Sequence, residues 1–511
     1  MEKLRKVLIP RVFIISLTLM LQLIVLIAVI LRFNEYFAFF YGASIFLSII
    51  ALLWIINDKS NPAYKIGWII PILLFPIFGG LFYIFFGRNK LNKRQRKKMK
   101  YIADKTQRTL LPNENILEEI KALSEDAAIQ SRYIQDYANF PPYNNTSSEY
   151  LPIGEIKFEK LKEELKKAKK FIFLEYFIIE EGVMWNSILE ILVEKAQSGV
   201  DVRLIYDDFG CLVTLPYKYY RKLEQLGIKT CVFNPLIPLL SLRLNNRDHR
   251  KIVIIDGHTG ITGGINLADE YINEIVKYGH WKDSAIMIKG EAVWNMTVMF
   301  LTMWDYLRGI DEDFNLFKPE LPLVEKNIKD GFVQPFADNP LDDEPVGEII
   351  YMNLINKAKR YVYITTPYLI IDNEMIAALT TAAKGGVDIR IITPYVADKN
   401  FVHLVTRSFY KILIDSGVKI YEYAPGFIHS KTFVTDDEYA VVGTINMDYR
   451  SLYLHFECGV WLYNSNSVLD VKEDFLETLE FCRQITAKDY QNVHWYHNLA
   501  AAILRVFAPL M

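Results

Sequence analysis

One short pattern of residues, His-x-Lys-x-x-x-x-Asp, occurs twice in this chain, 180 residues apart. The first copy is His249, Lys251 and Asp256 within HRKIVIID, and the second is His429, Lys431 and Asp436 within HSKTFVTD. A second element follows each Asp at the same distance and ends in an Asn, which is Asn266 in the first copy and Asn446 in the second. Two copies of both elements are too improbable to arise by chance, so the chain contains a duplicated unit.

The duplication extends over two long segments. The matching pairs are KAKKFIFLEYFII (167–179) with KAKRYVYITTPYL (357–369), and SGVDVRLIYDD (198–208) with GGVDIRIITPY (385–395). In each unit an apolar run typical of a strand is followed by a helical stretch, Ser187–Gln197 or Glu374–Lys384, and then by a second buried run. Crossover helices of this kind join parallel strands, so each unit predicts an α/β domain. We expect the first domain over residues 151–330 and the second over residues 331–511.

Each triplet is predicted to lie on a β-hairpin. The expected first strands are Lys251–Ile255 and Thr432–Thr435, and turn-forming residues begin at the Asp of each triplet. His and Lys two positions apart then project from one face. If each hairpin is centred one and a half residues after its Asp, Asn266 faces His249 and Asn446 faces His429. The Gly or Thr just before each Asn would leave room for a ligand.

These residue types suit the chemistry of phosphate esters. Lys supplies positive charge and Asn a neutral donor for phosphate oxygens. One His can act as a nucleophile while the other protonates a leaving oxygen, so the two are expected to titrate as a coupled pair. We expect no metal, because the Lys beside each His offers no ligand and repels a cation. A structural role for one of the two triplets stays open.

Four carboxylates accompany the histidines. Asp256 and Asp436 complete the catalytic set, and at the hairpin turns they are expected to hold backbone or neighbouring side chains rather than to touch substrate. Asp283 in GHWKD and Glu457 in LHFECG could orient the histidines, because a carboxylate on one imidazole nitrogen fixes the tautomer. A surface position is the alternative for both Asp283 and Glu457.

The first hundred residues are predicted to form a membrane region. Val12–Leu31 and Tyr36–Ile56 are each about long enough to cross a bilayer as a helix. Ile66–Phe86 has a similar length but contains two prolines and a Gly pair, so it either spans with a kink or dips in and returns. A cleaved signal peptide is the alternative for the first segment, although no small-residue cleavage site follows it. A polar helical connector, residues 101–150, comes next.

The charge distribution predicts the side of the membrane. Eight cations and no anion lie between Arg88 and Lys100, which places this flank and everything after it in the cytoplasm. The N-terminus is basic too, so either it is forced outward or one of the three segments does not cross. Subtracting those eight cations from the net charge of −2 leaves −10 for the remainder, which argues against a nucleic-acid partner.

The two halves differ by a ten-residue insertion before the first triplet. Pro235 and His249 are fourteen residues apart, whereas Pro425 and His429 are four apart. The inserted region, LIPLLSLRLNNR, is rich in Leu and Ile. It could rest on lipid or guide an acyl chain, or it could pack on its own domain.

Taken together, these residues resemble the phospholipase D superfamily, whose signature is the duplicated H-x-K-x4-D with a trailing G-[GST]-x-N. The apolar N-terminal segments, NNRDHRKIVIIDG, YGHWKDSAI, GTINMDYRS and the terminal APLM are similar to bacterial cardiolipin synthases over nearly the whole chain. The resemblance implies two pseudo-symmetric phospholipase D-type repeats, with mixed β-sheets flanked by helices, behind an N-terminal α-helical membrane region.

The resemblance also implies a reaction. A phosphatidyl group would pass from one phosphatidylglycerol to another through a phosphohistidine, giving cardiolipin and glycerol without a cofactor, and the family tendency favours His249 as nucleophile and His429 as acid. The implied partners are phosphatidylglycerol and the cell membrane, while the oligomeric state is not predicted. One departure is His455, where the family commonly has Asn.

Three other functions are compatible with parts of this sequence. A phospholipase D-type hydrolase of membrane lipids would use the same residues and is the main alternative. The apolar segments and the acidic remainder disfavour a nuclease, and the two intact triplets disfavour a scaffold without activity.

Overall fold

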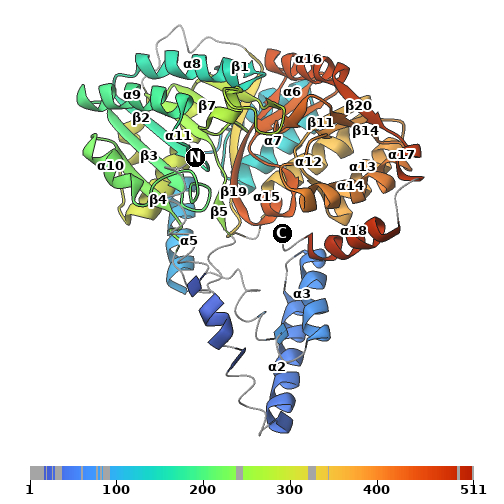
Figure 1. Cartoon of the computed structure of the whole chain (residues 1–511). Helices are drawn as coiled ribbons and strands as arrows, with labels where there is room; N and C mark the ends of the chain where they lie inside the picture. Colours follow the sequence, from blue (N-terminus) through green and yellow to red (C-terminus); the bar gives the residue numbers. More distant parts are fainter. Residues whose placement is uncertain are drawn as a thin grey trace.

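The computed structural model shows two lobes side by side, with the N-terminal helices projecting from one end (Figure 1). It describes residues 37–58, 61–75, 93–236, 246–319, 330–342, 344–491 and 495–508, and short stretches within residues 17–28 and 79–83. The insertion before His249 falls largely in residues 237–245, outside the described residues.

The first lobe is built on a seven-stranded mixed sheet with the strand order β1-β9-β7-β6-β2-β3-β4. Its strands are β1 (Thr146–Leu151), β2 (Phe171–Tyr176), β3 (Asp201–Asp207), β4 (Lys229–Phe233), β6 (Ile252–Ile255), β7 (Thr259–Gly263) and β9 (Ala285–Gly290), and its helices are α8 (Gly154–Lys167), α9 (Val183–Gln197), α10 (Tyr219–Gln225) and α11 (Val293–Arg308). β2, β3 and β4 are parallel because α9 and α10 carry the chain back between them. The other pairs are antiparallel.

The second lobe repeats this order as β10-β19-β17-β16-β11-β13-β14, with β20 added at the edge. Its strands are β10 (Phe332–Asp338), β11 (Tyr361–Thr365), β13 (Asp388–Pro394), β14 (Lys419–Tyr423), β16 (Thr432–Thr435), β17 (Tyr439–Gly443), β19 (His455–Tyr463) and β20 (Cys482–Ile485), and its helices are α12 (Val346–Lys357), α13 (Asn373–Lys384), α14 (Asn400–Ile414) and α16 (Asn466–Glu480). The predicted pair of α/β repeats with mixed sheets is confirmed.

Short elements fill the connections. They are β5 (Arg247–Asp248), β8 (His280–Lys282), β12 (Leu369–Ile370), β15 (Gly426–Ile428), β18 (Met447–Asp448), α15 (Tyr449–Tyr453), α17 (Lys488–Gln491) and two 3₁₀ turns at Asp269–Ile272 and Phe314–Phe317. β12 pairs with β18, β8 pairs with β15, and β5 pairs with β19. The last two pairs join the lobes to each other.

Strand β2 shows why these sequences form buried sheets. Its side chains alternate between two faces, so Phe171 and Phe173 enter one apolar core while Ile172 and Leu174 enter another. Helices cover both faces, and every residue of the strand is buried. A strand buried on both sides needs a continuous apolar run, which explains why FIFLEY reads as strand without polar alternation.

The core on one side of β2 continues into the second lobe. It includes Phe173 from the first sheet and Val441 and Val460 from the second, all buried. Across the seam the Thr262 hydroxyl lies 3.3 Å from the Cys458 sulfur. The two repeats therefore share one hydrophobic core rather than touching as separate domains.

The connector helices bind both lobes. They are α5 (Lys93–Thr109), α6 (Glu114–Leu123) and α7 (Glu125–Tyr137), and α5 packs on α11 while α7 packs on α12. On α7, the Ser131 hydroxyl donates a 2.7 Å hydrogen bond to Gln334 Oε1 and the Gln130 amide donates to the Ile350 carbonyl. The connector thus precedes the first repeat in sequence but lies partly against the second.

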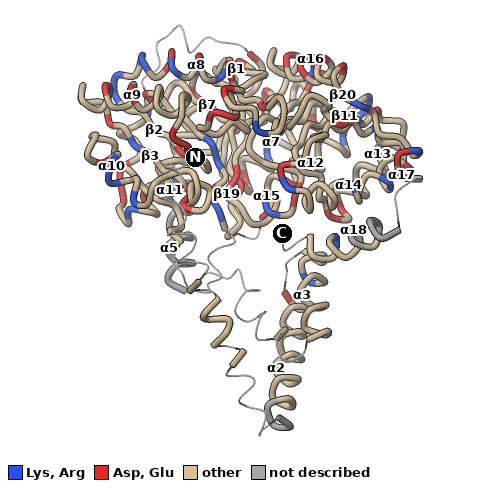
Figure 2. The backbone as a smooth tube through the Cα atoms, in the orientation of Figure 1, with Lys and Arg blue, Asp and Glu red and all other residues tan. Residues whose placement is uncertain are grey.

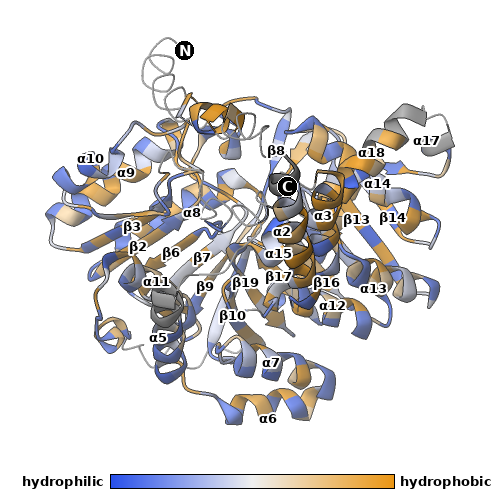
Figure 3. Cartoon of the chain, turned by 90° about the horizontal axis from the view of Figure 1, so that it is seen from below, coloured by the Kyte–Doolittle hydropathy of each residue, from blue (hydrophilic) through white to orange (hydrophobic). Residues whose placement is uncertain are grey.

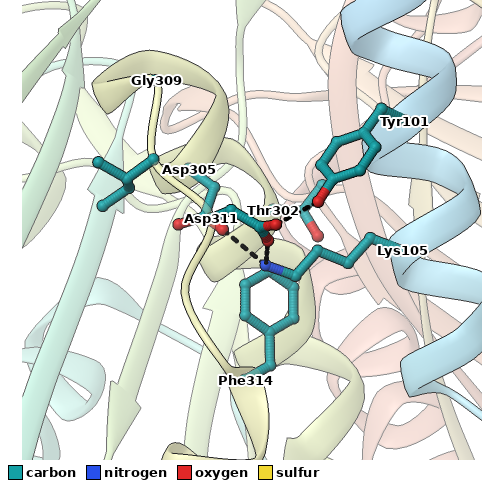
Figure 4. A pocket seen from close by; sticks show the side chains of 8 residues that line it. Tyr101, Lys105, Thr302, Asp305, Gly309, Asp311 and Phe314 are labelled. Atoms are coloured by element: carbon teal, nitrogen blue, oxygen red, sulfur yellow. Dashed lines mark hydrogen bonds and ion pairs between the residues drawn. The ribbon is translucent and has the colours of Figure 1, made fainter.

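A cavity of about 290 Å³ marks where α5 meets the end of α11 (Figure 4). Lys105 enters it, with Nζ 2.9 Å from Asp305 Oδ2, 2.6 Å from Asp311 Oδ1 and 3.9 Å above the Phe314 ring. Tyr101 also hydrogen-bonds Asp311. Lys105 thus pairs with the two aspartates and the aromatic ring of this cavity, and these contacts hold α5 against the first lobe.

The N-terminal helices α2 (Phe37–Asn57) and α3 (Pro62–Leu74) pack on each other, and α18 (Trp495–Phe507) packs on α3 and α14. Asn61 ties them to the second lobe, because its amide donates to Asp372 and to the Tyr453 hydroxyl, each at 2.9 Å. Figure 2 shows that α2 carries no Lys, Arg, Asp or Glu, and Figure 3 shows α2, α3 and α18 as largely apolar.

The expected membrane spans are only partly seen. The segment Tyr36–Ile56 largely coincides with α2 (Phe37–Asn57), and α3 covers the first part of the third segment, while most of the residues after Phe75 in that segment lie outside the described residues. Most of Val12–Leu31 lies outside the described residues. Among the described helices none combines the length and apolar character that crossing a bilayer requires, so the predicted transmembrane helices are not confirmed.

Candidate active site

The two triplets lie on matching hairpins, β6–β7 and β16–β17, in the middle of the molecule (Figure 3). Each hairpin has a three-residue loop, because Ile255 pairs with Thr259 and Thr435 pairs with Tyr439. The hairpins are centred on Gly257 and its counterpart, so the predicted register is wrong by one residue. The first two residues of each loop have positive φ angles and form the tight turn. A third loop residue follows them, so the number of loop residues is odd and the hairpin is centred on a residue rather than between two.

The motif aspartates hold these loops in place. Asp256 accepts hydrogen bonds from three consecutive backbone N–H groups at the start of β2, at 2.7–2.9 Å. Asp436 does the same at the start of β11, at 2.6–2.9 Å. Both carboxylates are thus engaged by backbone, and they act on the hairpins rather than on a reacting group.

Short strands hold each histidine against the other lobe. β5, which precedes His249, runs parallel to the start of β19, and the His249 N–H donates to the Phe456 carbonyl at 3.0 Å. β15, which precedes His429, runs parallel to β8, and the His429 N–H donates to the Lys282 carbonyl at 2.7 Å. Neither histidine is positioned by its own repeat alone.

The orienting carboxylates cross the seam as well. His249 Nδ1 lies 2.9 and 3.0 Å from the two oxygens of Glu457, and His429 Nδ1 lies 2.7 Å from Asp283 Oδ2. Both carboxylates are fully buried, so the alternative of a surface position is wrong. With a carboxylate as partner Nδ1 carries the proton, which leaves the Nε2 lone pair of each ring available.

The residue two positions before each Asn differs between the repeats because it contacts a different orienting carboxylate in each. A Cβ on Gly264 would lie 2.0 Å from Asp283 Oδ1, so only Gly admits that carboxylate. At the matching position the Thr444 hydroxyl donates to Glu457. The space that the sequence suggested for a ligand is therefore occupied by the orienting carboxylates.

The two lysines are buried beside the histidines. Each Nζ donates to the backbone carbonyl of the His two positions earlier, at 2.5 Å for Lys251. Burial lowers the pKa of Lys251 to about 8 and that of Lys431 to about 7, although nearby carboxylates, Glu457 for the former and Asp283 for the latter, oppose the change.

Burial also lowers the pKa of His249 and His429 well below the usual 6.5. The charges of Lys251 and Lys431 lower both values further, so each histidine is influenced by the lysines of both triplets. Burial raises the pKa of Asp283 to about 7. Both imidazoles are therefore neutral at rest near pH 7.

Comparison with known proteins agrees with this geometry. A family described as cardiolipin synthase, phospholipase D-like domain, matches residues 161–304 and 351–479. The chain belongs to this family. It is an enzyme of the phospholipase D superfamily, in a branch of phosphatidyltransferases. A second family, described as the phospholipase D-nuclease N-terminal region, matches residues 46–88.

Individual relatives cover almost the whole chain. An uncharacterized protein of Streptococcus mutans is 44% identical over 90% of this chain and 99% of its own length. Cardiolipin synthases of Halalkalibacterium halodurans and Geobacillus kaustophilus are 32% and 34% identical, each over 91% of this chain and 92% of their own length. The crystal structure of a phosphatidylserine synthase from Haemophilus influenzae shares the fold, with a TM-score of 0.56 and 15% identity over 75% of this chain and 98% of that one.

Among the described residues, neither asparagine has a hydrogen bond to the histidine of its own hairpin. Asn266 Oδ1 accepts from the Ile178 N–H at 3.0 Å, and its amide donates to the Tyr271 hydroxyl at 2.7 Å. The Tyr271 ring lies 5.7 Å from the ring of His429, so Asn266 is connected through Tyr271 to the histidine of the other repeat. Asn446 Oδ1 is buried and makes no hydrogen bond to any residue that the structure describes.

Aromatic rings that the sequence reasoning did not single out line the site. The Phe177 ring lies 5.0 Å from His249, and the Trp281 and Phe427 rings lie 5.6 and 5.9 Å from His429. Trp281 and Phe427 each come two residues before a site residue, Asp283 or His429. On an extended chain that spacing puts side chains on one face, and it could have identified them.

Proposed function

We propose that this enzyme is a cardiolipin synthase that transfers a phosphatidyl group from one phosphatidylglycerol to another, releasing glycerol. The observation that carries the proposal is the pair of buried histidines, each with Nδ1 on a carboxylate of the other repeat and with a buried lysine beside it. The names of the relatives from Halalkalibacterium and Geobacillus support the choice of substrate and product.

In the first step His249 acts as nucleophile. Its Nε2 lone pair attacks the phosphorus of the donor lipid, and the bond from phosphorus to the glycerol headgroup oxygen breaks. His429, protonated on Nε2, gives its proton to that oxygen, so glycerol leaves and a phosphatidyl-histidine remains. The negative phosphodiester counteracts the lysine charges, and this raises the pKa of His429 toward the value that an acid needs.

In the second step the roles reverse. Neutral His429 takes a proton from a headgroup hydroxyl of the second phosphatidylglycerol, whose oxygen attacks the phosphorus. The bond from phosphorus to His249 Nε2 breaks and cardiolipin is released, while His429 ends the step protonated and returns to the neutral form unless another donor lipid binds. Lys251, Lys431, Asn266 and Asn446 would support the charge that builds on the phosphate oxygens.

The lipid substrates imply that the enzyme works at the cell membrane. The α2 helix exposes large apolar side chains, among them Phe46 at 64% and Leu53 at 57% of their area, and it projects from the catalytic lobes (Figure 1). We propose that this end associates with the bilayer, with the lobes on the cytoplasmic side that the basic flank predicts.

The test is a product assay. The purified full-length protein is incubated with phosphatidylglycerol vesicles, and cardiolipin, glycerol and phosphatidic acid are measured. Cardiolipin and glycerol in equal amounts are expected. Phosphatidic acid as the sole lipid product would overturn the transferase assignment and favour the hydrolase, since water would then resolve the intermediate.

A further inference from the structure

A third imidazole lies in the site without a part in this chemistry. His455 begins β19, is 9% exposed, and its ring centre lies 5.5 Å from that of His249. Neither of its ring nitrogens makes a hydrogen bond to a residue within the described ranges. A buried polar group without a hydrogen bond destabilises the fold, so the position of His455 requires an explanation.

The surroundings of His455 have the geometry of a metal site. One nitrogen of His249, one nitrogen of His455 and one oxygen of Glu457 all lie within 4.8 Å of one another. From Glu457 Oε1 the distances are 2.9 Å to His249 Nδ1 and 3.7 Å to His455 Nδ1. Neighbouring ligands of a tetrahedral Zn²⁺ are about 3.4 Å apart, and both Glu457 distances lie close to that value.

We propose that His249, His455 and Glu457 form an inhibitory site for Zn²⁺. Two imidazoles, one carboxylate and an open position are a ligand set that zinc favours, whereas Mg²⁺ and Ca²⁺ prefer oxygen ligands alone. The inhibitory effect rests on the function proposed above, because it requires that His249 Nε2 takes part in turnover.

The inhibition follows from the tautomer of His249. In the resting site Nδ1 carries the proton toward Glu457 and Nε2 holds the lone pair. When Zn²⁺ binds Nδ1, the proton moves to Nε2 and the ring stays neutral, so no lone pair remains to attack phosphorus. Zn²⁺ also takes the Glu457 oxygen that oriented the ring. The block holds for either role of His249, since a nucleophile needs the Nε2 lone pair to bond phosphorus and an acid–base catalyst needs Nε2 to alternate between lone pair and proton.

The charges around the site make this binding reversible. Lys251 and Lys431 both act electrostatically on His249, and they oppose a resident cation. Glu457 is the one anionic ligand of the set. Zinc is therefore a ligand that fills the site when its concentration rises and that a chelator removes, rather than a permanent part of the enzyme.

The experiment compares the full-length protein with two variants. His455→Asn removes both ring nitrogens and keeps a polar side chain of smaller size. His403→Asn, on α14 and outside the cluster, is the matched control for metal bound elsewhere. Turnover of phosphatidylglycerol is measured against Zn²⁺ and against Mg²⁺, and the visible absorption of added Co²⁺ reports tetrahedral coordination without any need for activity.

We expect Zn²⁺, but not Mg²⁺, to inhibit the unaltered protein and the His403→Asn control, and a chelator to restore turnover. His455→Asn should keep its activity without Zn²⁺, need at least tenfold more Zn²⁺ for half inhibition, and lose the Co²⁺ absorption. If His455→Asn does not fold, His455→Gln replaces it.

The two proposals fail in different ways. Equal Zn²⁺ sensitivity and equal Co²⁺ absorption in the His455 variant and the control would overturn the metal site while leaving cardiolipin synthesis intact. Co²⁺ absorption that depends on His455, in a protein that forms no cardiolipin, would support the metal site and overturn the proposed function.

Discussion

Replacing Gly264 by Ala tests whether the buried carboxylate on His429 matters for turnover. Gly264 does not adopt a left-handed φ, so Ala is compatible with its backbone. The added Cβ would lie 2.0 Å from Asp283 Oδ1 and 2.7 Å from its Cγ. Non-bonded contacts of this kind need about 3.5 Å, so the carboxylate must move by about 1.5 Å.

That movement sets the expected loss. The His429 to Asp283 hydrogen bond is 2.7 Å, and a displacement of this size breaks it. Misplacing a catalytic group by about 1 Å lowers turnover about 10²-fold, and loss of a partner that orients a ligand or catalytic His has a similar effect. We expect kcat to fall about 10²-fold in Gly264→Ala, with about 1–3 kcal/mol of destabilisation from overpacking.

The assay is a double-mutant cycle on cardiolipin formation, with thermal unfolding measured in parallel. Asp283→Ala alone should lower kcat by a similar factor. Adding Gly264→Ala to it should have less than about a threefold further effect, because no carboxylate remains for the methyl group to displace. Thr444→Ser keeps the hydroxyl that binds Glu457 and should stay near the unaltered rate. Full activity in Gly264→Ala, or losses that multiply in the double variant, would refute the reasoning.

Three further predictions concern the same molecule. His249→Ala and His429→Ala should each lower cardiolipin formation at least about 10³-fold while the circular dichroism spectrum is kept, and substantial turnover in either variant would contradict the paired-histidine mechanism. A chelator added to the purified enzyme should leave turnover unchanged, and a loss restored by added metal would mean that catalysis needs a cation. Burial lowers the pKa of Lys157 from 10.5 to about 7, so the unfolded chain binds the extra proton between these values and stability rises with pH across that window. Lys157→Met should therefore raise the free energy of unfolding near pH 7 by roughly 1–4 kcal/mol and by much less near pH 10, and an equal gain at both pH values would show that the charge is not responsible.

The repeated sequence made much of the fold predictable. Ser187–Gln197 and Glu374–Lys384 fall within α9 and α13, because a helical pattern seen in both copies excludes an accidental one. The hairpins after His249 and His429 were likewise predicted from alternation and turn residues. The ten candidate site residues lie in matching positions of the two repeats, and their roles in turnover remain predictions.

The contacts that each histidine makes with the other repeat could not be predicted from the sequence. β5 is two residues long and pairs with a strand more than 200 positions away, and so short an element has no periodic pattern to recognise. The spacing along the chain indicated that Asp283 and Glu457 could orient a histidine, but it did not indicate which histidine each would hydrogen-bond. The hairpin register was also missed, because Asp256 and Asp436 adopt left-handed backbone while their carboxylates bind the N–H groups of distant strands.

The crossed carboxylates also bear on how such a chain arose. A single repeat carries one histidine and one carboxylate, yet the fold keeps them from meeting within that repeat. Two identical copies facing each other would complete both pairs at once, so an ancestor with one repeat could work only as a twofold dimer. Fusion of the two genes would have made that partnership permanent and freed the copies to diverge. The two copies now differ at this contact, because Gly264 makes room for Asp283 in one and the Thr444 hydroxyl donates to Glu457 in the other.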